Sequence, residues 1–334
     1  MHGSGIPYIM AKLCDAAFMG GGVRGIGLSG AAKGFLDAGY RFRNVAGSSA
    51  GAIVAALVAA GFTGDELEAE TRGADYSSFK EKKLLDRFGP AGEFLNFDLN
   101  YGVYSADAFE HWLQGLLERK NKTVFSDVSY EENGKVYSRL LVTASDISTQ
   151  KPLVFPRDLA EFGVDPYAFP IAKAVRMSMS IPLFYEPYKL KGRDGRERLI
   201  ADGGLFCNYP IGLVDHRAEN PEVPVFGFKF AKHTAWRDFS KPFKLLDYLK
   251  AVIAAVLGAQ YAQDGECFPG DGERAVYIPT DVGGAPVGIA DFDLSKNTAA
   301  ALFNNGLSAA NAFLKAWDFG AWRKRFRGKL ANNE

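Results

Sequence analysis

A serine between small residues is the first feature of this chain that could do chemistry. Residues 47–51 read GSSAG, the pattern G-x-S-x-G, and they precede an alanine-rich apolar run at 52–60. In so tight a strand–turn–helix, the positions two before and two after the serine must be small, and here they are Gly47 and Gly51. The sequence therefore predicts a nucleophile elbow that exposes the hydroxyl of Ser49.

A serine nucleophile needs a base, and Asp202 is the best-placed candidate. Residues 188–206 predict a hairpin whose second strand ends at Asp202, and two glycines follow it. Asp-Gly is also an ordinary turn pair, but at a strand end it leaves the carboxylate open to a serine hydroxyl. His216 and His233 lie in polar, loop-like sequence with no clear strand end before them. We therefore expect a Ser-Asp pair and no histidine.

A glycine-rich run lies close to the start of the chain. Residues 20–25 read GGGVRG, which matches G-x-G-x-x-G and follows the apolar stretch 15–19. Backbone N–H groups in a loop that opens a helix attract negative charge. That charge can belong to a dinucleotide or to the oxyanion of an ester under attack. A third explanation is an ordinary tight turn.

The end of the second expected strand favours the oxyanion. A dinucleotide site needs an acidic residue there to bind the ribose, but the strand 42–46 runs directly into the serine turn. Asp37 precedes this strand, and Arg41 and Arg43, which could face a 2′-phosphate, lie before its end. The nucleotide interpretation therefore lacks its acidic residue.

The expected oxyanion donors are the amides of Gly21 and Gly22, with Gly20, Arg24 and Gly25 in the same loop. Parallel strands joined by a right-handed crossover end on the same side of a sheet. The loop and the elbow serine should therefore lie side by side. Arg24 adds positive charge, suited to an anionic head group or to steadying the loop.

The strands and helices that must position these residues alternate along the chain. This alternation predicts an α/β fold with a parallel sheet. Strands are expected at 15–19, 42–46, 138–147, 188–202 as a hairpin, 223–230 and 274–280. Helices are expected at 28–38, 52–60, 63–73, 104–120 with Ser105 as N-cap, 168–182, 242–263 and 298–317.

Composition limits the partners. The 39 basic and 39 acidic residues cancel, which disfavours nucleic acid. Cys14, Cys207 and Cys267 are few and far apart, so a reducing, cytoplasmic location without a disulfide framework is expected. The sequence shows no metal-ligand spacing, no signal peptide and no apolar run long enough to span a bilayer. We expect neither a metal nor a cofactor.

One domain is the economical interpretation, because no repeat or linker interrupts the chain. We assign it to residues 12–317, with an N-terminal extension at 1–11 and a basic tail at 318–334. The tail can be a solvated helix end, or it can dock on an anionic membrane surface.

Three motifs in order, GGGVRG, GSSAG and DGG at 202–204, resemble the patatin-like phospholipase family. The similarity extends to YSADAFEHWLQGLL, LLVTASDIST, AVRMSMSIPLFYEPY and ADGGLFCNYP, and covers most of residues 14–315. It implies a modified α/β-hydrolase-like three-layer sandwich with a mostly parallel central sheet. In this resemblance Ser49 matches the nucleophile, Asp202 matches the base, and the 20–25 loop matches the oxyanion hole. Met19 departs from members that carry an acid there.

The resemblance implies hydrolysis of acyl esters in phospholipids or related lipids, of phospholipase A or lysophospholipase type. Peripheral association with a membrane surface is a separate expectation that rests on the basic tail. Two alternatives stay open: a nucleotide-binding oxidoreductase that uses the 20–25 loop, and a non-catalytic lipid-binding relative. Aromatic segments around 76–104 and 180–190 can wall an acyl channel or simply pack in the core. Partial burial beside Leu205 and Phe206 is expected to raise the pKa of Asp202.

Overall fold

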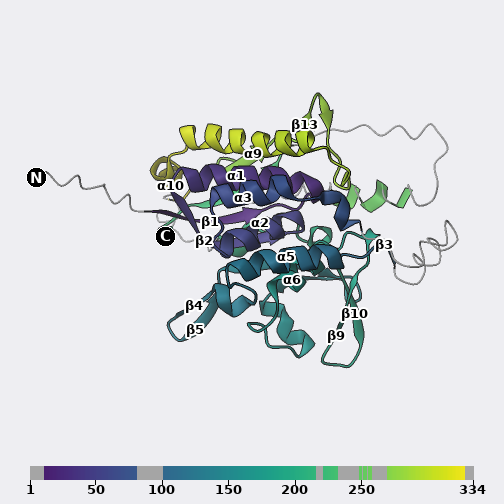
Figure 1. Cartoon of the computed structure of the whole chain (residues 1–334). Helices are drawn as coiled ribbons and strands as arrows, with labels where there is room; N and C mark the ends of the chain where they lie inside the picture. The colour runs from purple at the N-terminus through teal and green to yellow at the C-terminus, as the bar shows by residue number, and fades with distance from the viewer. Residues whose placement is uncertain are drawn as a thin grey trace, which may run out of the picture.

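A central sheet flanked by helices forms the body of the protein (Figure 1). The structure is a computed structural model. It describes residues 11–80, 101–215, 221–231, 248–249, 251–253, 255–257 and 269–327.

The sheet is mixed but mostly parallel. Its strand order is β12-β11-β1-β2-β6-β10-β9, and β7 also pairs with β6. The five strands from β12 to β6 are parallel, whereas β10, β9 and β7 run antiparallel to their neighbours. The bounds are β1 Lys12–Phe18, β2 Tyr40–Ser48, β6 Leu140–Asp146, β7 Lys151–Phe155, β9 Tyr188–Lys191, β10 Glu197–Asp202, β11 Val225–Phe230 and β12 Ala275–Ile278.

Smaller pairings and helices complete the described residues. The short strand pairs are β3 Gly102–Tyr104 with β8 Leu183–Tyr185, β4 Ser129–Glu132 with β5 Lys135–Ser138, and β13 Asp281–Val282 with β14 Ala285–Pro286. The α-helices are α1 Gly25–Asp37, α2 Ala50–Ala59, α3 Gly64–Gly73, α5 Asp107–Arg119, α6 Ile171–Ser178, α7 Ile211–Val214, α9 Lys296–Ala316 and α10 Phe319–Phe326. The 3₁₀ turns are η1 Gly22–Arg24, η2 Tyr76–Phe79, η4 Phe125–Val128, η5 Arg157–Phe162 and η6 Gly203–Leu205.

Burial explains why the central strands read as continuous apolar runs. Every residue of β11 and the last five residues of β1 are buried, which is expected of strands covered on both faces. Helices α1 and α9 pack lengthwise on each other, and Figure 1 shows both above the central strands. Short helix α7 packs against β1, β2 and β11. The predicted α/β fold with a central, mostly parallel sheet is confirmed.

Aromatic rings fill the space between the sheet and helices α1 and α9. Phe35 of α1 meets Phe226 and Phe228 of β11 edge-on, each with ring centroids 4.9 Å apart. Phe18 of β1 stacks on Phe228 at 4.7 Å. Such pairs add about 0.5–1.5 kcal/mol each beyond the area they bury. The layer between the sheet and these two helices is therefore packed mainly by aromatic rings.

Some predicted helix limits need correction. The first helix begins at Gly25, three residues before the expected start, because the glycine loop turns straight into it. Ser105 is not the N-cap of α5, because Ala106 holds that position. The Ser105 hydroxyl instead accepts the N–H of Asp107 at 3.1 Å. Of the helix expected at 242–263, the described residues 248–249, 251–253 and 255–257 are helical, and the rest lies outside the described part.

The start of the basic tail is a docked helix. Trp322 of α10 is buried, and its indole N–H donates to the Gly270 carbonyl at 2.9 Å. Its basic neighbours Arg323, Lys324 and Arg325 are exposed. No helix within the described ranges has both the length and the apolar character to cross a bilayer.

Candidate active site

The turn after β2 holds Ser49 in a rarely populated backbone conformation. Its φ is 51° and its ψ is −125°, a region that costs a non-glycine residue about 1–3 kcal/mol. A Cβ on Gly47 would overlap the backbone of Gly51, and a Cβ on Gly51 would overlap the carbonyl of Phe18. Only glycine fits at these two positions. The turn is therefore as tight as a nucleophile elbow requires.

A buried serine on α6 holds this turn in place. The Ser49 N–H donates to Ser178 Oγ at 2.8 Å, and the Ser178 side chain is fully buried. Two residues later, the carbonyl of Ser180 accepts the N–H of Asp202 at 2.9 Å. The segment 178–180 therefore binds the backbone of both candidate residues. Sequence reasoning missed Ser178, since no local pattern distinguishes it from another small residue in its helix.

Ser49 and Asp202 form a short hydrogen bond. The Ser49 hydroxyl donates to Asp202 Oδ2 at 2.6 Å. Both side chains are buried, with residue exposures of 4 % and 1 %. The structure therefore brings together the two residues singled out in the sequence.

The two residues meet because β10 stops at the level of the elbow. In the sheet, Ser48 pairs with Thr143 of β6, and Asp202 pairs with Ala144. Strand β10 is antiparallel to β6. Asp202 therefore reaches the edge where the parallel strands end from the opposite direction. The hairpin of β9 and β10 begins beyond that edge, and β10 runs back as far as the serine.

Burial raises the pKa of the Asp202 carboxyl to about 6. Desolvation of the charged form is the largest cause, and hydrogen bonds from the Ser49 hydroxyl and the Gly204 N–H partly offset it. The Gly204 N–H lies 2.7 Å from Asp202 Oδ1. Among the described residues no basic side chain forms an ion pair with this carboxylate. The expected burial is complete instead of partial, while Phe206, expected to cover the carboxyl, is itself exposed.

The glycine loop lies beside the elbow, because Phe18 at the end of β1 pairs with Gly47 of β2. The Gly20 N–H donates to the Asn208 carbonyl at 3.0 Å, so it is not available to an oxyanion. The amides of Gly21 and Gly22 donate to no group in the described residues. Gly22 has φ +58°, and a Cβ there would overlap the carbonyl of Ile289.

The Arg24 side chain holds this loop in place. Its Nε donates to the Gly21 carbonyl at 3.1 Å. Its guanidinium also lies over the ring of Phe230, 5.1 Å from the centroid. Gly25 already belongs to α1, and its N–H is bonded to carbonyls within the turn. Of the loop residues, Gly21 and Gly22 therefore remain the candidate oxyanion donors, and Arg24 is a support.

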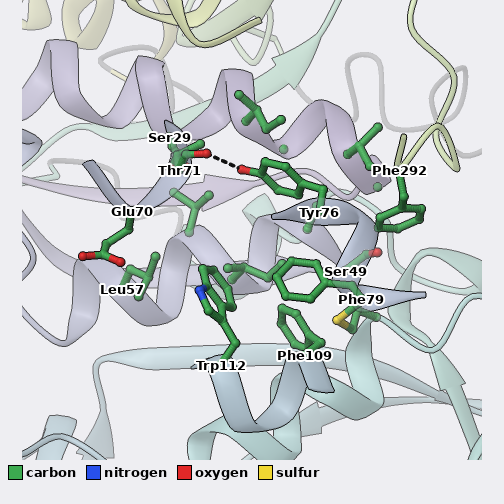
Figure 2. A pocket seen from close by; sticks show the side chains of 18 of the residues that line it. Ser29, Ser49, Leu57, Glu70, Thr71, Tyr76, Phe79, Phe109, Trp112 and Phe292 are labelled. Atoms are coloured by element: carbon green, nitrogen blue, oxygen red, sulfur yellow. Dashed lines mark hydrogen bonds between the residues drawn. The ribbon is translucent and has the colours of Figure 1, made fainter. Parts of the chain in front are cut away.

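Two spaces of different character meet at Ser49. A small pocket, here named the polar pocket after the Ser49, Asp202 and Asn208 side chains in its wall, is also lined by Gly20, Gly21, Gly22, Ile181, Leu257 and Ile289. A larger cavity, with about 670 Å³ of empty space that includes its opening to solvent, extends from Ser49 between α1, α2, α3 and α5. Figure 2 shows its aromatic wall of Tyr76, Phe79, Phe109 and Trp112. The expected aromatic wall is thus present in part, and residues 81–100 lie outside the described ranges.

The residues that a nucleotide site would use are engaged elsewhere. Arg43 donates to both oxygens of buried Asp15, at 3.0 and 2.7 Å. Asp37 forms an ion pair with Lys33 at 3.1 Å, and Arg41 donates to the carbonyls of Leu36 and Tyr40. In the described ranges no cluster of three or more His, Cys, Asp or Glu side chains could hold a metal ion. His216, His233 and Cys267 lie outside those ranges.

The chain belongs to the patatin-like phospholipase family, whose model matches residues 16–215. This confirms the family resemblance, and it supports a lipid acyl hydrolase activity in general. The match includes the glycine loop, the elbow and Asp202.

Relatives occur in bacteria, a virus and a plant. The uncharacterized protein YqhO of Bacillus subtilis is 33% identical over 315 residues, which cover 91% of this chain and 99% of YqhO. The uncharacterized protein R571 of Acanthamoeba polyphaga mimivirus is 24% identical over 67% of each chain. Patatin-like protein 6 of Arabidopsis thaliana is 24% identical over 63% of this chain and 43% of its own length.

Two solved structures align with most of the chain. VipD from Legionella pneumophila has a TM-score of 0.49 and 15% identity, over 92% of this chain and 67% of VipD. The type III effector ExoU has a TM-score of 0.47 and 14% identity, over 91% of this chain and 52% of ExoU.

Proposed function

We propose that this protein is a serine-aspartate lipid acyl hydrolase that acts through an acyl-enzyme on Ser49. The observation that carries the proposal is the 2.6 Å hydrogen bond from the Ser49 hydroxyl to the buried carboxylate of Asp202. A carboxylate whose pKa is raised to about 6 is a stronger base than an exposed one, and it is still ionised at neutral pH. Family membership supports the lipid substrate class.

In the first half of the reaction, Ser49 Oγ attacks the ester carbonyl carbon while Asp202 Oδ2 takes its proton. The carbonyl oxygen becomes an oxyanion, and the amides of Gly21 and Gly22, which have no partner among the described residues, donate to it in this proposal. Each such donor stabilises the transition state by about 2.7–4 kcal/mol. The intermediate then expels the alcohol, which takes the proton from Asp202, and the acyl group stays on Ser49.

In the second half, water attacks the acyl-enzyme. Asp202 takes a proton from this water, and the same amides hold the second oxyanion. When the Ser49–acyl bond breaks, the proton returns to Ser49 Oγ and the fatty acid leaves. No cofactor takes part in this sequence, and Asp202 ends in the ionised form in which it began.

We propose that the substrates are the acyl esters of phospholipids or lysophospholipids, as for a phospholipase A or a lysophospholipase. A panel of phospholipids, lysophospholipids and short nitrophenyl esters tests it, with wild type and Ser49→Ala side by side. We expect fatty acid release by wild type and none above background by the variant. A fluorophosphonate probe should label wild type and leave Ser49→Ala unlabelled.

Two other outcomes would replace the proposal. A folded wild type that binds lipid but neither hydrolyses an ester nor reacts with the probe would be a non-catalytic lipid-binding relative. Binding of a dinucleotide with no probe labelling would favour an oxidoreductase.

We further propose peripheral association with a lipid surface from the cytoplasmic side. The helical residues Tyr248, Leu249, Val252 and Val256 are exposed by 36–51 %. Their spacing places them on one face of a helix. The neighbouring Leu257 is buried and lines the polar pocket that holds Ser49 and Asp202. An apolar face at this opening would let a substrate pass from a bilayer to the serine.

Flotation with phosphatidylcholine vesicles tests this association. Val252→Lys should weaken binding while hydrolysis of a water-soluble ester stays unchanged. Val136→Lys is the matched control, because Val136 is similarly exposed on the β4–β5 hairpin. Equal binding by wild type, Val252→Lys and the control would rule out this surface.

A further inference from the structure

The two spaces that meet at Ser49 are suited to different parts of a substrate. The polar pocket contains Asp202, the amides of Gly21 and Gly22, and Asn208. It therefore suits the reacting carbonyl, the leaving alcohol and water. The larger cavity is lined mainly by apolar side chains, so it suits the acyl chain of the ester. This division rests on the hydrolase function proposed above.

The apolar cavity follows one face of helix α2. Ala50, Ile53, Val54 and Leu57 line it and recur three or four residues apart, which places them in a single stripe. Ser49 is the N-cap of this helix, so the stripe leads directly away from the nucleophile. The eight residue-to-residue steps from Ser49 to Leu57 correspond to about 12 Å of helix.

The far end of the cavity carries charge. Figure 2 shows Leu57 and Glu70 at the end opposite Ser49. The Glu70 carboxylate forms an ion pair with Arg119 at 2.8 Å, and this pair links α3 to α5. The Arg119 side chain is 56 % exposed, so this pair stays in contact with water. An acyl chain that passed this point would leave the apolar walls for solvent and would gain no further burial. The apolar path therefore ends at this level.

We infer that this cavity is an acyl subsite of limited length, which accepts a medium chain and gains nothing from a longer one. Carbon–carbon bonds of about 1.5 Å, joined at about 111°, advance an extended chain by about 1.3 Å per bond. About nine bonds therefore fit into about 12 Å. The subsite takes an acyl group of about ten carbons, and Leu57 with the Glu70–Arg119 pair sets that limit.

A series of monomeric nitrophenyl esters, from about 4 to 16 carbons in the acyl group, tests the limit. Each methylene that enters the cavity should raise kcat/KM by up to about fourfold. The rise should stop near ten carbons. A rate that keeps rising to the longest ester, or that ignores chain length, would overturn the inference. Absence of hydrolysis for every ester, with no probe labelling of Ser49, would instead reject the proposed function.

Substitutions at Leu57 move the limit in opposite directions. Leu57→Trp should fill the far end and shift the best ester to a shorter chain. Leu57→Ala should open it and shift the best ester by about two carbons to a longer chain, by the same advance per bond. Glu70→Leu removes the carboxylate and should also favour longer chains.

The readout is the ratio of kcat/KM for a long and a medium ester, because loss of folded protein lowers both rates equally and leaves the ratio unchanged. Leu67→Ala is the matched control: Leu67 lies on α3 and is fully buried, and it does not line the cavity. Its ratio should equal that of wild type. A shift with Leu67→Ala as large as that with Leu57→Ala, or unchanged ratios in all three cavity variants, would refute the assigned limit.

Discussion

Asp15 and Asp202 are two buried aspartates of the same sheet, each only 1 % exposed, but their surroundings differ. Asp15 on β1 receives two hydrogen bonds from the Arg43 guanidinium and two from Asn44, all within 3.1 Å. Asp202 on β10 receives one from the Ser49 hydroxyl and one from the Gly204 N–H. A cation faces the first carboxylate, whereas neutral donors face the second.

The difference shows that burial alone does not identify a functional carboxylate. A buried charge with a matched counter-charge holds elements together, and at Asp15 it joins β1 to β2. A buried charge with too few partners has a raised pKa and can accept a proton near neutral pH. Asp146 on β6 follows the first pattern, since Arg198 lies 3.4 Å from it. Asp202 follows the second pattern.

The largest expected effect is on turnover. Asp202→Asn removes the proposed base and should lower kcat by about 10²–10⁴-fold. Asp15→Asn should leave kcat per folded molecule close to that of wild type. Steady-state kinetics on a soluble ester, with the folded fraction measured by circular dichroism, checks both. Equal losses of kcat in the two variants would remove the distinction between the two aspartates.

The pH profile should report the Asp202 carboxyl. Because its pKa is raised to about 6 and the ionised form is the base, kcat/KM should rise with pH through about 6 and then level off. Two pH units below that midpoint the rate should be about 100-fold lower. The measurement is kcat/KM against pH on an ester stable over the range. A rate that is flat between about pH 4 and 8 would mean that another group is the base.

Stability should change with opposite signs at the two aspartates. The folded pKa of Asp202 is raised to about 6, so the folded state binds the proton more tightly than the unfolded chain. Its contribution is fully present below about pH 4 and is lost as pH rises through about 6, a loss of about 2–3 kcal/mol. Asp202→Asn should therefore raise Tm at about pH 8 and change it little at about pH 4.

Asp15→Asn should instead lower stability at about pH 8, by about 1–3 kcal/mol, because it weakens the bonds to Arg43 and Asn44. Thermal melts of wild type and both variants at the two pH values give the comparison. A lower Tm for both variants at high pH would show that the Asp202 carboxylate is stabilised by its partners, like that of Asp15.

The smallest effect is expected at the support of the elbow. Ser178→Ala leaves the buried Ser49 N–H without its partner, which costs about 1–3 kcal/mol, and we expect about a tenfold loss in kcat as the hydroxyl loses alignment. KM should change little, because Ser178 touches neither cavity. Ser145→Ala is the control, since Ser145 is fully buried and its hydroxyl has no partner in the described part of the chain. A tenfold loss there as well would mean that any small cavity has this effect.

The sequence was sufficient for residues whose role follows from local geometry. Gly47, Ser49 and Gly51 form a pattern within five residues, and the apolar runs around them predicted the strand and helix. Asp202 was found because it ends a strand before two glycines. The family match confirms the class of protein, while the catalytic roles of individual residues and the division at 12–317 stay predictions.

Other contacts between segments distant in the chain could not be predicted from the sequence. Ser178 lies 129 residues from Ser49, and its hydrogen bond depends on how α6 packs against α2. The bond between the Gly20 N–H and the Asn208 carbonyl likewise joins two loops remote in sequence. The antiparallel pairing of β10 with β6, which brings Asp202 level with Ser49, has a register that apolar spacing does not specify.

The segment that binds the backbone of both Ser49 and Asp202 also forms part of the wall of the larger cavity. Ser178 and Ser180 hold the two residues, while Met179 and Ile181 line the cavity beside Ser49. One short stretch of chain therefore sets the distance between the Ser49 hydroxyl and the Asp202 carboxylate. The same stretch would contact any group that fills the cavity. In amide hydrogen exchange, Ser49 and Asp202 should open in a single event, and a bound acyl chain should slow both by the same factor.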